Sequence, residues 1–399
     1  MTATERNGKL VITLGQRIDT NNAPQIEKEV IETINAHAGT DVVFDAEKLE
    51  YISSSGLRIL MKVLKKTGKP VDIINVSAEV YEIFDVTGFT ELMNVQTNAE
   101  LPDDKPMREI SIEGKEMIGR YSIGTFYRLD EETVVKVFDP GVRYDTVIQK
   151  ESENARNAFV AGVPTVIPFD DVKVGNCYGK VYEMQNCRFL LDVIANDKAH
   201  LDDYIRRFAK TVKKMHSIEV DSKKFSPFKK NMLEMLPLLS KTLNAEETEK
   251  VKSIIENIPD RNTFLHGICR LDLAILQNNE ILFYDLGMAA FGHPITDLFI
   301  MYYDFGQHGK FAHSTIKEQI KRFTHDEMDL IWKIFITEYL GTDDMEFIKK
   351  VERQIDMIGL ARTLFLSLVD SENRIDETYE NIKNQLFNYF DKGLEPICF

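Results

Sequence analysis

The chain has 399 residues, of which 43% are hydrophobic and 28% are charged, a composition typical of globular proteins with substantial cores. Its formal net charge of −15 argues against non-specific binding to nucleic acid or to anionic membranes. The four cysteines show no metal-binding spacing and are expected to stay reduced. The N-terminus lacks the apolar core of a signal peptide, and no apolar run approaches the ~20 residues that span a bilayer. We therefore expect a cytoplasmic protein without a membrane or nucleic-acid partner.

The first hundred residues alternate between strands and helices. Strand patterns cover residues 10–14, 41–44 and 71–76, and amphipathic helix patterns cover residues 21–37 and 54–66. This alternation predicts one compact α/β domain over residues 1–98. Two prolines in a polar stretch then predict a linker over residues 99–107.

The remainder of the chain is predicted to divide into two regions, residues 108 to about 185 and about 186 to 399. From Arg108 to about Glu183, the sequence predicts short strands and one helix, which covers residues 144–161. From His200 onward it predicts mostly helix, interrupted by a loop and two short strands between Thr263 and Gly287. Neither part contains an internal repeat or a low-complexity segment.

A turn of small residues, Ser53-Ser54-Ser55-Gly56, begins the second predicted helix. Ser53 is well suited to be its N-cap, because its hydroxyl can accept a backbone N–H of the first turn. The free N–H groups and the positive helix end favour an anion, and a phosphate here would add about two negative charges to an exposed surface. The turn therefore predicts either a partner-facing switch or a plain helix cap followed by small residues.

The order of these elements, together with the serine turn, resembles the STAS domain (sulfate transporter and anti-sigma factor antagonist) over residues 8–97. In that family the turn reads Asp-Ser-Ser/Thr-Gly-Leu, and its first Ser after the Asp is phosphorylated by a partner anti-sigma kinase. The resemblance assigns this role to Ser54. It implies a bacterial protein whose partner is an anti-sigma-factor-like protein or another regulator. Ser53 stands where the family usually has Asp, which removes a charge beside the phosphate site. The implied partner surface consists of Ser53, Ser54, Ser55, Gly56 and the acidic turn residue Asp19.

Three features of the second part suggest nucleotide chemistry, each with an alternative. Gly119 and Gly124 lie in a segment that is either a glycine-rich turn over a phosphate or an ordinary hairpin. Lys136 interrupts an apolar strand, which favours an inward lysine with a partner, Glu151 or alternatively Glu153. The carboxylate of Asp285 follows an apolar strand, where it could hold Mg²⁺ or belong to a simple turn.

These features, with His266-Gly267 between them, resemble the aminoglycoside phosphotransferase-like branch of the protein-kinase-like fold. Met215-His216 and Gly292-His293-Pro294 with Asp297 extend the resemblance, which covers residues 108 to about 310. It implies an α+β, two-lobed domain over residues 108–399, with ATP and Mg²⁺ as possible ligands. The implied nucleotide-binding residues are Lys136, Glu151, Gly119, Gly124, Glu183 and Met184, and Asp285 is the implied metal ligand.

The catalytic loop departs from the family pattern His-Gly-Asp-x-x-x-x-Asn. Ile268 occupies the Asp position and Leu273 the Asn position, so the loop has neither a proton acceptor nor the second metal ligand. Tyr121 replaces the second glycine of the glycine-rich loop. Asp272, in the same loop, is a weak substitute for the base. It lies four residues after the base position, Ile268, so its side chain would normally point away from the substrate.

The sequence therefore predicts a regulatory protein that combines a STAS-like domain with a pseudokinase, which senses a nucleotide or small molecule or acts as a scaffold. On this interpretation no intact catalytic residue is expected. The alternative is an active ATP-dependent small-molecule phosphotransferase with a rewired catalytic loop. A third interpretation is an interaction protein in which Tyr121 fills the nucleotide cleft.

Overall fold

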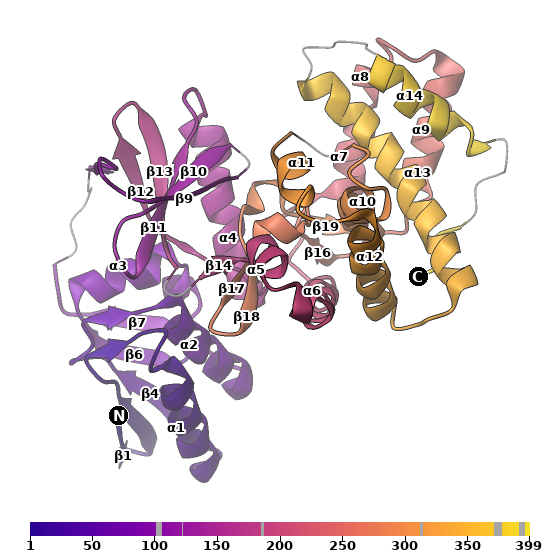
Figure 1. Cartoon of the computed structure of the whole chain (residues 1–399). Helices are drawn as coiled ribbons and strands as arrows, with labels where there is room; N and C mark the ends of the chain where they lie inside the picture. Colours follow the sequence, from indigo (N-terminus) through magenta and orange to yellow (C-terminus); the bar gives the residue numbers. More distant parts are fainter. Residues whose placement is uncertain (101–105, 122, 185–186, 312–313, 371–376, 391–395) are drawn as a thin grey trace. The chain divides into compact units, whose positions relative to one another are not determined.

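The structure, a computed structural model, describes residues 1–100, 106–121, 123–184, 187–311, 314–370, 377–390 and 396–399. The chain divides into two compact units (Figure 1). The first unit contains Met1–Cys187 and Gln277–Tyr284, and the second contains Arg188–Leu276 and Asp285–Phe399. No helix among the described residues is both long enough and apolar enough to cross a membrane.

The first unit begins with a five-stranded mixed sheet in the order β1-β2-β4-β6-β7. β1 pairs with β2 in antiparallel fashion, and the other neighbours are parallel. The strands are β1 (Thr2–Arg6), β2 (Lys9–Thr13), β4 (Asp41–Asp45), β6 (Asp72–Val76) and β7 (Asn94–Thr97). The sequence did not predict β1, because all its residues are exposed and no apolar alternation marks it.

Three helices accompany this sheet: α1 (Ala23–Ala36), α2 (Ser54–Thr67) and α3 (Ala78–Val86). The predicted cap is confirmed, because the Ser53 hydroxyl accepts the N–H of Gly56 at 3.2 Å. Two short strands, β3 (Arg17–Ile18) and β5 (Tyr51–Ile52), pair in parallel just before α1 and α2. This pairing brings the Asp19 turn next to the serine turn.

The same unit contains a six-stranded sheet in the order β8-β12-β13-β11-β10-β9, which is the N-lobe of the kinase-like part. Its helix α4 (Gln149–Ala161) follows a π-helical turn (Tyr144–Ile148), in agreement with the predicted helix. Strand β18 (Glu280–Phe283) also belongs to this unit. The sheet consists of β8 (Arg108–Glu109), β9 (Met117–Tyr121), β10 (Gly124–Arg128), β11 (Thr133–Phe138), β12 (Pro168–Val174) and β13 (Cys177–Glu183).

The hydrophobic core of the N-terminal sheet extends into the N-lobe. Phe159 of α4 and Ile167 belong to the same buried cluster as the residues of the N-terminal sheet and helices. The ring of Phe89 lies 6.0 Å from that of Phe84 and 6.1 Å from that of Phe159. Burial of shared apolar surface therefore joins the STAS-like part and the N-lobe in one compact unit.

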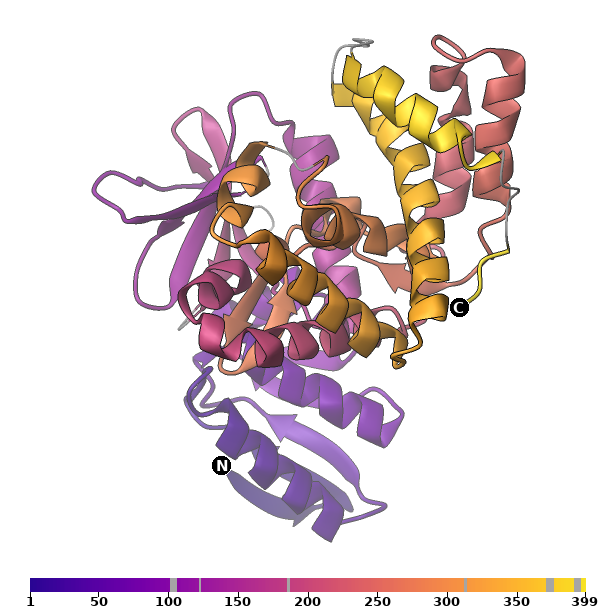
Figure 2. The ribbon, with the colours of Figure 1, turned by 45° about the vertical axis from the view of Figure 1, so that its right-hand side comes forward.

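The second unit is mostly helical, as predicted. Figure 2 shows the long helix α13 alongside α14, and the two helices pack together. Its helices are α5 (Leu190–Asn196), α6 (Leu201–Met215), α7 (Phe228–Glu234), α8 (Leu236–Leu239), α9 (Ala245–Glu256), α10 (Ile295–Met301), α11 (Ser314–Ile320), α12 (His325–Leu340), α13 (Met345–Asp370) and α14 (Glu377–Phe387). Its short strands include β14 (Arg188–Phe189), β15 (Ser226–Pro227), β16 (Thr263–Leu265), β17 (Ala274–Gln277) and β19 (Ala290–Gly292).

Candidate functional site

The serine turn (residues 53–56) is buried except for the half-buried Ser55, which corrects our prediction of an exposed surface. Ser53 is 0% exposed and Ser54 is 2% exposed. Glu183, the last residue of β13, directs its carboxylate at this turn. One oxygen accepts the N–H of Ser54 at 2.8 Å, and the other accepts the hydroxyl of Thr20 at 2.6 Å. A carboxylate of the N-lobe thus occupies the N-terminus of α2, where a helix favours an anion.

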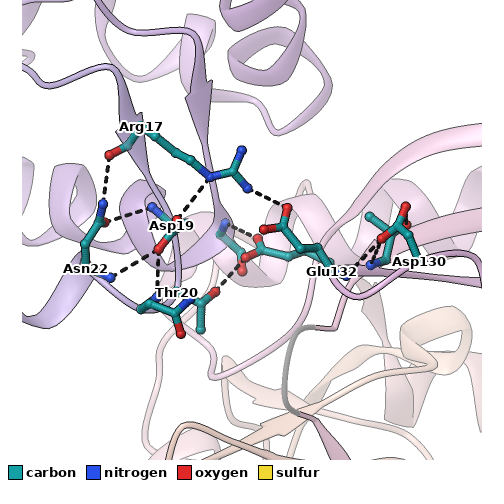
Figure 3. Close-up of polar contacts among 10 residues, drawn as sticks. Arg17, Asp19, Thr20, Asn22, Asp130 and Glu132 are labelled. Carbon is teal, nitrogen blue, oxygen red and sulfur yellow. Dashed lines mark hydrogen bonds and ion pairs between the residues drawn. The ribbon is translucent and has the colours of Figure 1, made fainter.

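A second acidic group of the N-lobe contacts the neighbouring turn of the STAS-like part (Figure 3). The guanidinium of Arg17 binds both Asp19, at 3.0 Å, and Glu132, and it stacks over the ring of Tyr51 at 4.2 Å. Asp19 also accepts the backbone N–H groups of Asn21 and Asn22. Burial alone would raise the pKa of Asp19, but these hydrogen bonds and Arg17 hold it below its usual value. Asp19 therefore shapes the turn that presents Arg17.

The two acidic groups of the N-lobe are positioned by adjacent strand ends. Thr133 of β11 is the register partner of Glu183 in β13, and the N–H of Met184 donates to the carbonyl of Glu132 at 2.9 Å. Burial raises the pKa of Glu183, and hydrogen bonds from Thr20 and Ser54 oppose only part of that shift. Glu183 is therefore a buried carboxylate at the serine turn, while its predicted role with a nucleotide, like that of Met184, stays a prediction.

Lys136 points inward and pairs with Glu151, as predicted. Its ammonium lies 3.2 and 3.3 Å from the two carboxylate oxygens, and the two side chains are 0% and 3% exposed. The Tyr182 hydroxyl also donates to Glu151, at 3.0 Å. The alternative partner, Glu153, instead binds Lys150 on the surface of α4. This buried pair is the arrangement that positions a lysine for phosphate oxygens in kinase-like sites.

The glycine-rich segment forms the β9–β10 hairpin, in which Gly119 faces Phe126 and Gly124 faces Tyr121. A Cβ on Gly124 would lie 2.9 Å from the carbonyl oxygen of Val137 and 3.1 Å from Cγ of Lys136. The close approach of β10 to β11 beside Lys136 therefore requires glycine. The side chain of Tyr121 lies outside the described part of the structure, so its predicted effect on the cleft stays a prediction.

In the second unit, a buried carboxylate supports the loop that begins at His266. Asp297 of α10 accepts the backbone N–H groups of His266 and Gly267 at 2.7 and 2.8 Å, and it contacts the ring of His216 at 3.2 Å. Burial would raise the pKa of Asp297, but His216, His266 and Arg362 hold it below its usual value. The guanidinium of Arg362 donates to the carbonyl of Gly267. These contacts fix the backbone of the loop at His266 and Gly267.

The side chains of this loop depart from the family pattern described above. Ile268 is half-buried, and Leu273 is 0% exposed. Asp272, the weak substitute for the base, is also 0% exposed, and both its oxygens accept hydrogen bonds from Arg270. Asp304, in a π-helical turn (Tyr302–Gly306), interacts electrostatically with both residues. Burial raises the pKa of Asp304 to about 7, against the effect of the positive charge on Arg270.

Asp285 adopts a left-handed conformation, with φ 62° and ψ 55°, at the start of a 3₁₀ turn. Residues other than glycine rarely take this conformation, and such backbone outliers concentrate at functional sites. Its carboxylate is the oxygen donor that Mg²⁺ prefers, whereas Leu273 supplies no donor at the second family position. The residues therefore fit a nucleotide-bound Mg²⁺ only in part, and the metal role of Asp285 stays a prediction.

Sequence reasoning missed several residues of these sites. Thr20 and Glu132 carried no signal, because the contacts that use them join segments far apart in the chain. Arg270 was visible within the loop motif, but its pairing with Asp272 was not expected. Asp304 gave no signal, because a lone Asp between aromatic residues does not indicate burial beside an Arg–Asp pair.

The fold and these sites define a kinase-like protein with an N-terminal STAS domain, and the comparisons agree. A family model described as STAS domain matches residues 1–101, and one described as phosphotransferase enzyme family matches residues 119–331. Because the latter match spans more than half of the chain, the chain belongs to the phosphotransferase enzyme family.

Individual relatives resemble one part or the other. The chain is 27% identical over 93 residues to an anti-sigma-B factor antagonist of Staphylococcus aureus, covering 23% of this chain and 85% of the relative. It is 28% identical over 103 residues to the putative anti-sigma factor antagonist BtrV of Bordetella bronchiseptica, covering 25% and 88%. Similar solved structures include a choline/ethanolamine kinase family protein of Mesorhizobium loti (TM-score 0.43, 13% identity, 70% of this chain and 87% of that chain). Another is an aminoglycoside 2′-phosphotransferase in its GDP complex (TM-score 0.45, 15% identity, 71% and 94%).

Proposed function

We propose that this protein is a regulatory member of its family, which binds a partner protein through the STAS domain and uses the kinase-like part as a nucleotide or small-molecule sensor or as a scaffold. One observation carries the proposal. Ile268 occupies the position of the general base in a loop whose supporting contacts to Asp297 are all present. The loop is thus built as in an enzyme, but the group that would accept the substrate proton is a hydrocarbon.

The size of the expected defect follows from the chemistry. A general base contributes about 10²- to 10⁴-fold to a rate, and it must reach the substrate oxygen within hydrogen-bond distance. Asp272 does not meet this requirement, because it is buried and both its oxygens bind Arg270. Leu273 cannot replace the family's Asn at the metal.

The retained groups favour ligand binding without turnover. Lys136 and Glu151 form the buried pair that contacts nucleotide phosphates in kinases, and Asp285 offers an oxygen to a metal ion. ATP with Mg²⁺ would supply the transferable phosphoryl group when bound. Lys136 would orient its phosphates, and Glu151 would hold the lysine in place.

Calorimetric titration with ATP, with and without Mg²⁺, followed by turnover assays over a panel of hydroxylated small molecules, tests this part of the proposal. We expect ATP to bind. Lys136→Met should abolish this binding, whereas Glu153→Gln, on the exposed face of the helix that carries Glu151, should leave it unchanged. Turnover that Asp285→Ala removes would overturn the pseudokinase assignment. A complete absence of binding would leave only the scaffold role.

A specific observation supports the alternative of an active phosphotransferase. Burial raises the pKa of Asp304 to about 7, which suits proton exchange at neutral pH, and because Asp304 is itself buried it would act on a substrate through the Arg270–Asp272 pair with which it interacts. If turnover is found, Asp304→Asn should abolish the limb of the pH–rate profile near pH 7 and Asp272→Asn should leave it. The opposite result would assign the base to Asp272.

For the STAS domain, the anti-sigma factor antagonists that it resembles support a regulatory protein as the partner. Ser54 is the proposed phosphorylation site, and the modifying enzyme would be a separate kinase, since this chain lacks the base. A Ser54→Asp variant that still bound every partner of the wild type would argue against a phosphorylation switch.

A further inference from the structure

The contact between the STAS domain and the N-lobe is strongly asymmetric in its chemistry. Around the two acidic groups the STAS side provides donors: the guanidinium of Arg17, the hydroxyl of Thr20 and the backbone N–H of Ser54. The N-lobe side answers them with the carboxylates of Glu132 and Glu183, and elsewhere in the contact the carbonyl of Thr165 accepts from the Arg58 guanidinium. The STAS surface is thus a receptor for two acidic groups, and the chain itself supplies both.

The contact also seals the residue that the proposed function requires to be accessible. The side chain of Ser54 is 2% exposed, so a kinase cannot reach its hydroxyl while the contact is closed. A phosphate on Ser54 would add a dianion beside the Glu183 carboxylate, which accepts the N–H of the same residue. Two acidic groups cannot share that helix terminus without repulsion. Closure of the contact and phosphorylation of Ser54 therefore exclude each other.

The two acidic residues are joined through the backbone. Glu183 ends β13, Glu132 directly precedes β11, and the N–H of Met184 donates to the carbonyl of Glu132. The groups that contact the serine turn and Arg17 therefore come from neighbouring segments of the N-lobe.

We infer that Glu183, together with Glu132, is an internal acidic ligand that occupies the partner surface of the STAS domain, so that the kinase-like part masks that surface. An outside partner binds by replacing both groups, and it presents one acidic group to the serine turn and a second to Arg17. This inference rests on the proposed partner binding of the STAS domain. Phosphorylation of Ser54 excludes Glu183 from the serine turn, and by the same repulsion it excludes the acidic group of an outside partner.

Hydrogen exchange of the full-length protein, followed by mass spectrometry of peptides that contain Ser54, tests the masking without knowledge of the partner. In Glu183→Ala we expect at least tenfold faster exchange at the serine turn, because the Ser54 N–H loses its acceptor. Glu183→Gln should keep the wild-type rate, because an amide oxygen still accepts that hydrogen bond. Glu131→Gln is the matched control, since the side chain of this exposed neighbour forms none of the hydrogen bonds between the described residues of the two parts.

A charge exchange separates electrostatic release from general unfolding. Ser54→Asp should accelerate exchange in the peptides around both Thr20 and Glu183, and Glu183→Lys should do the same. The double variant Ser54→Asp/Glu183→Lys should restore wild-type exchange, because opposite charges then meet at the turn. Wild-type rates in Glu183→Ala, or no restoration in the double variant, would overturn the inference. Because exchange is measured on the chain alone, it can support masking even if the proposed partner binding fails.

Discussion

Two loops of this protein, one in each compact unit, rely on a buried carboxylate that accepts backbone N–H groups. Asp297 holds the loop at His266 and Gly267, and Glu183 holds the serine turn at Ser54. The hydrogen bonds are similar in length, but the surroundings are not. Asp297 faces His216, His266 and Arg362, which hold its pKa below the usual value, whereas burial leaves the pKa of Glu183 raised.

This difference separates a permanent support from a releasable contact. The charge of Asp297 is compensated from several sides, so its loss leaves buried N–H groups without an acceptor and a buried positive charge uncompensated. The charge of Glu183 is opposed mainly by neutral donors, so its burial has a cost that an open state would relieve. The catalytic-loop framework should therefore resist perturbation, while the STAS surface should respond to charge and pH.

The largest effect is expected at Asp297. Replacement by Ala leaves the N–H groups of His266 and Gly267 without their acceptor and removes a negative charge that compensates the buried Arg362, and breaking such a network costs about 3–5 kcal/mol. Chemical unfolding of Asp297→Ala should show this loss, whereas Asp343→Ala, an exposed site, should be neutral. A loss below about 1 kcal/mol would refute the role of Asp297 as the main support of the loop.

Glycine substitutions compare the two loops directly. Gly267 has φ 88°, and a Cβ there would lie 2.1 Å from the carbonyl oxygen of Met288, so Gly267→Ala combines backbone strain with a clash against backbone. We expect a loss of about 3 kcal/mol. Gly56 lies in helix α2, and its added Cβ would meet side-chain atoms of Ile52 and Ile18 at 2.6 and 2.8 Å. Gly56→Ala should cost about 1 kcal/mol, because alanine favours the helix. Equal losses in thermal unfolding would contradict the difference between the loops.

The parts of these sites that the sequence could predict depend on local patterns. The valines around Lys136 predicted an inward lysine, and the helix that follows predicted Glu151 as its partner. Ser53 was predicted as a cap because capping involves only the first turn of its own helix. The Glu183–Ser54 contact joins residues 129 positions apart, and neither local pattern indicates the other. The serine turn was wrongly predicted to be exposed because small polar residues occur both in open turns and at close-packed contacts.

Asp304 extends the comparison to a second carboxylate whose pKa is raised by burial. Burial raises its pKa from 3.8 in the unfolded chain to about 7 in the fold, so the native state retains a proton that the unfolded state releases. Its contribution to stability is complete below about pH 4, is lost as the pH rises to about 7, and stays lost above that. Relative to the wild type, Asp304→Asn should gain on the order of 2 kcal/mol between pH 5 and pH 8. Parallel pH profiles of unfolding would contradict the assignment.

The smallest effect is expected at Glu183, and it tests the comparison most directly. Because the pKa of Glu183 in the closed contact is raised above its usual value of 4.5, the closed state retains a proton that an open state would release. Closure should therefore strengthen as the pH falls through the raised value towards 4.5, with protection of the serine turn changing by less than about tenfold per pH unit. Protection factors, corrected for intrinsic exchange, measure this, and Glu183→Gln should remove the dependence. Protection that instead increased with pH would mean that the charged form holds the turn, and Glu183 would then be a permanent support of the same kind as Asp297.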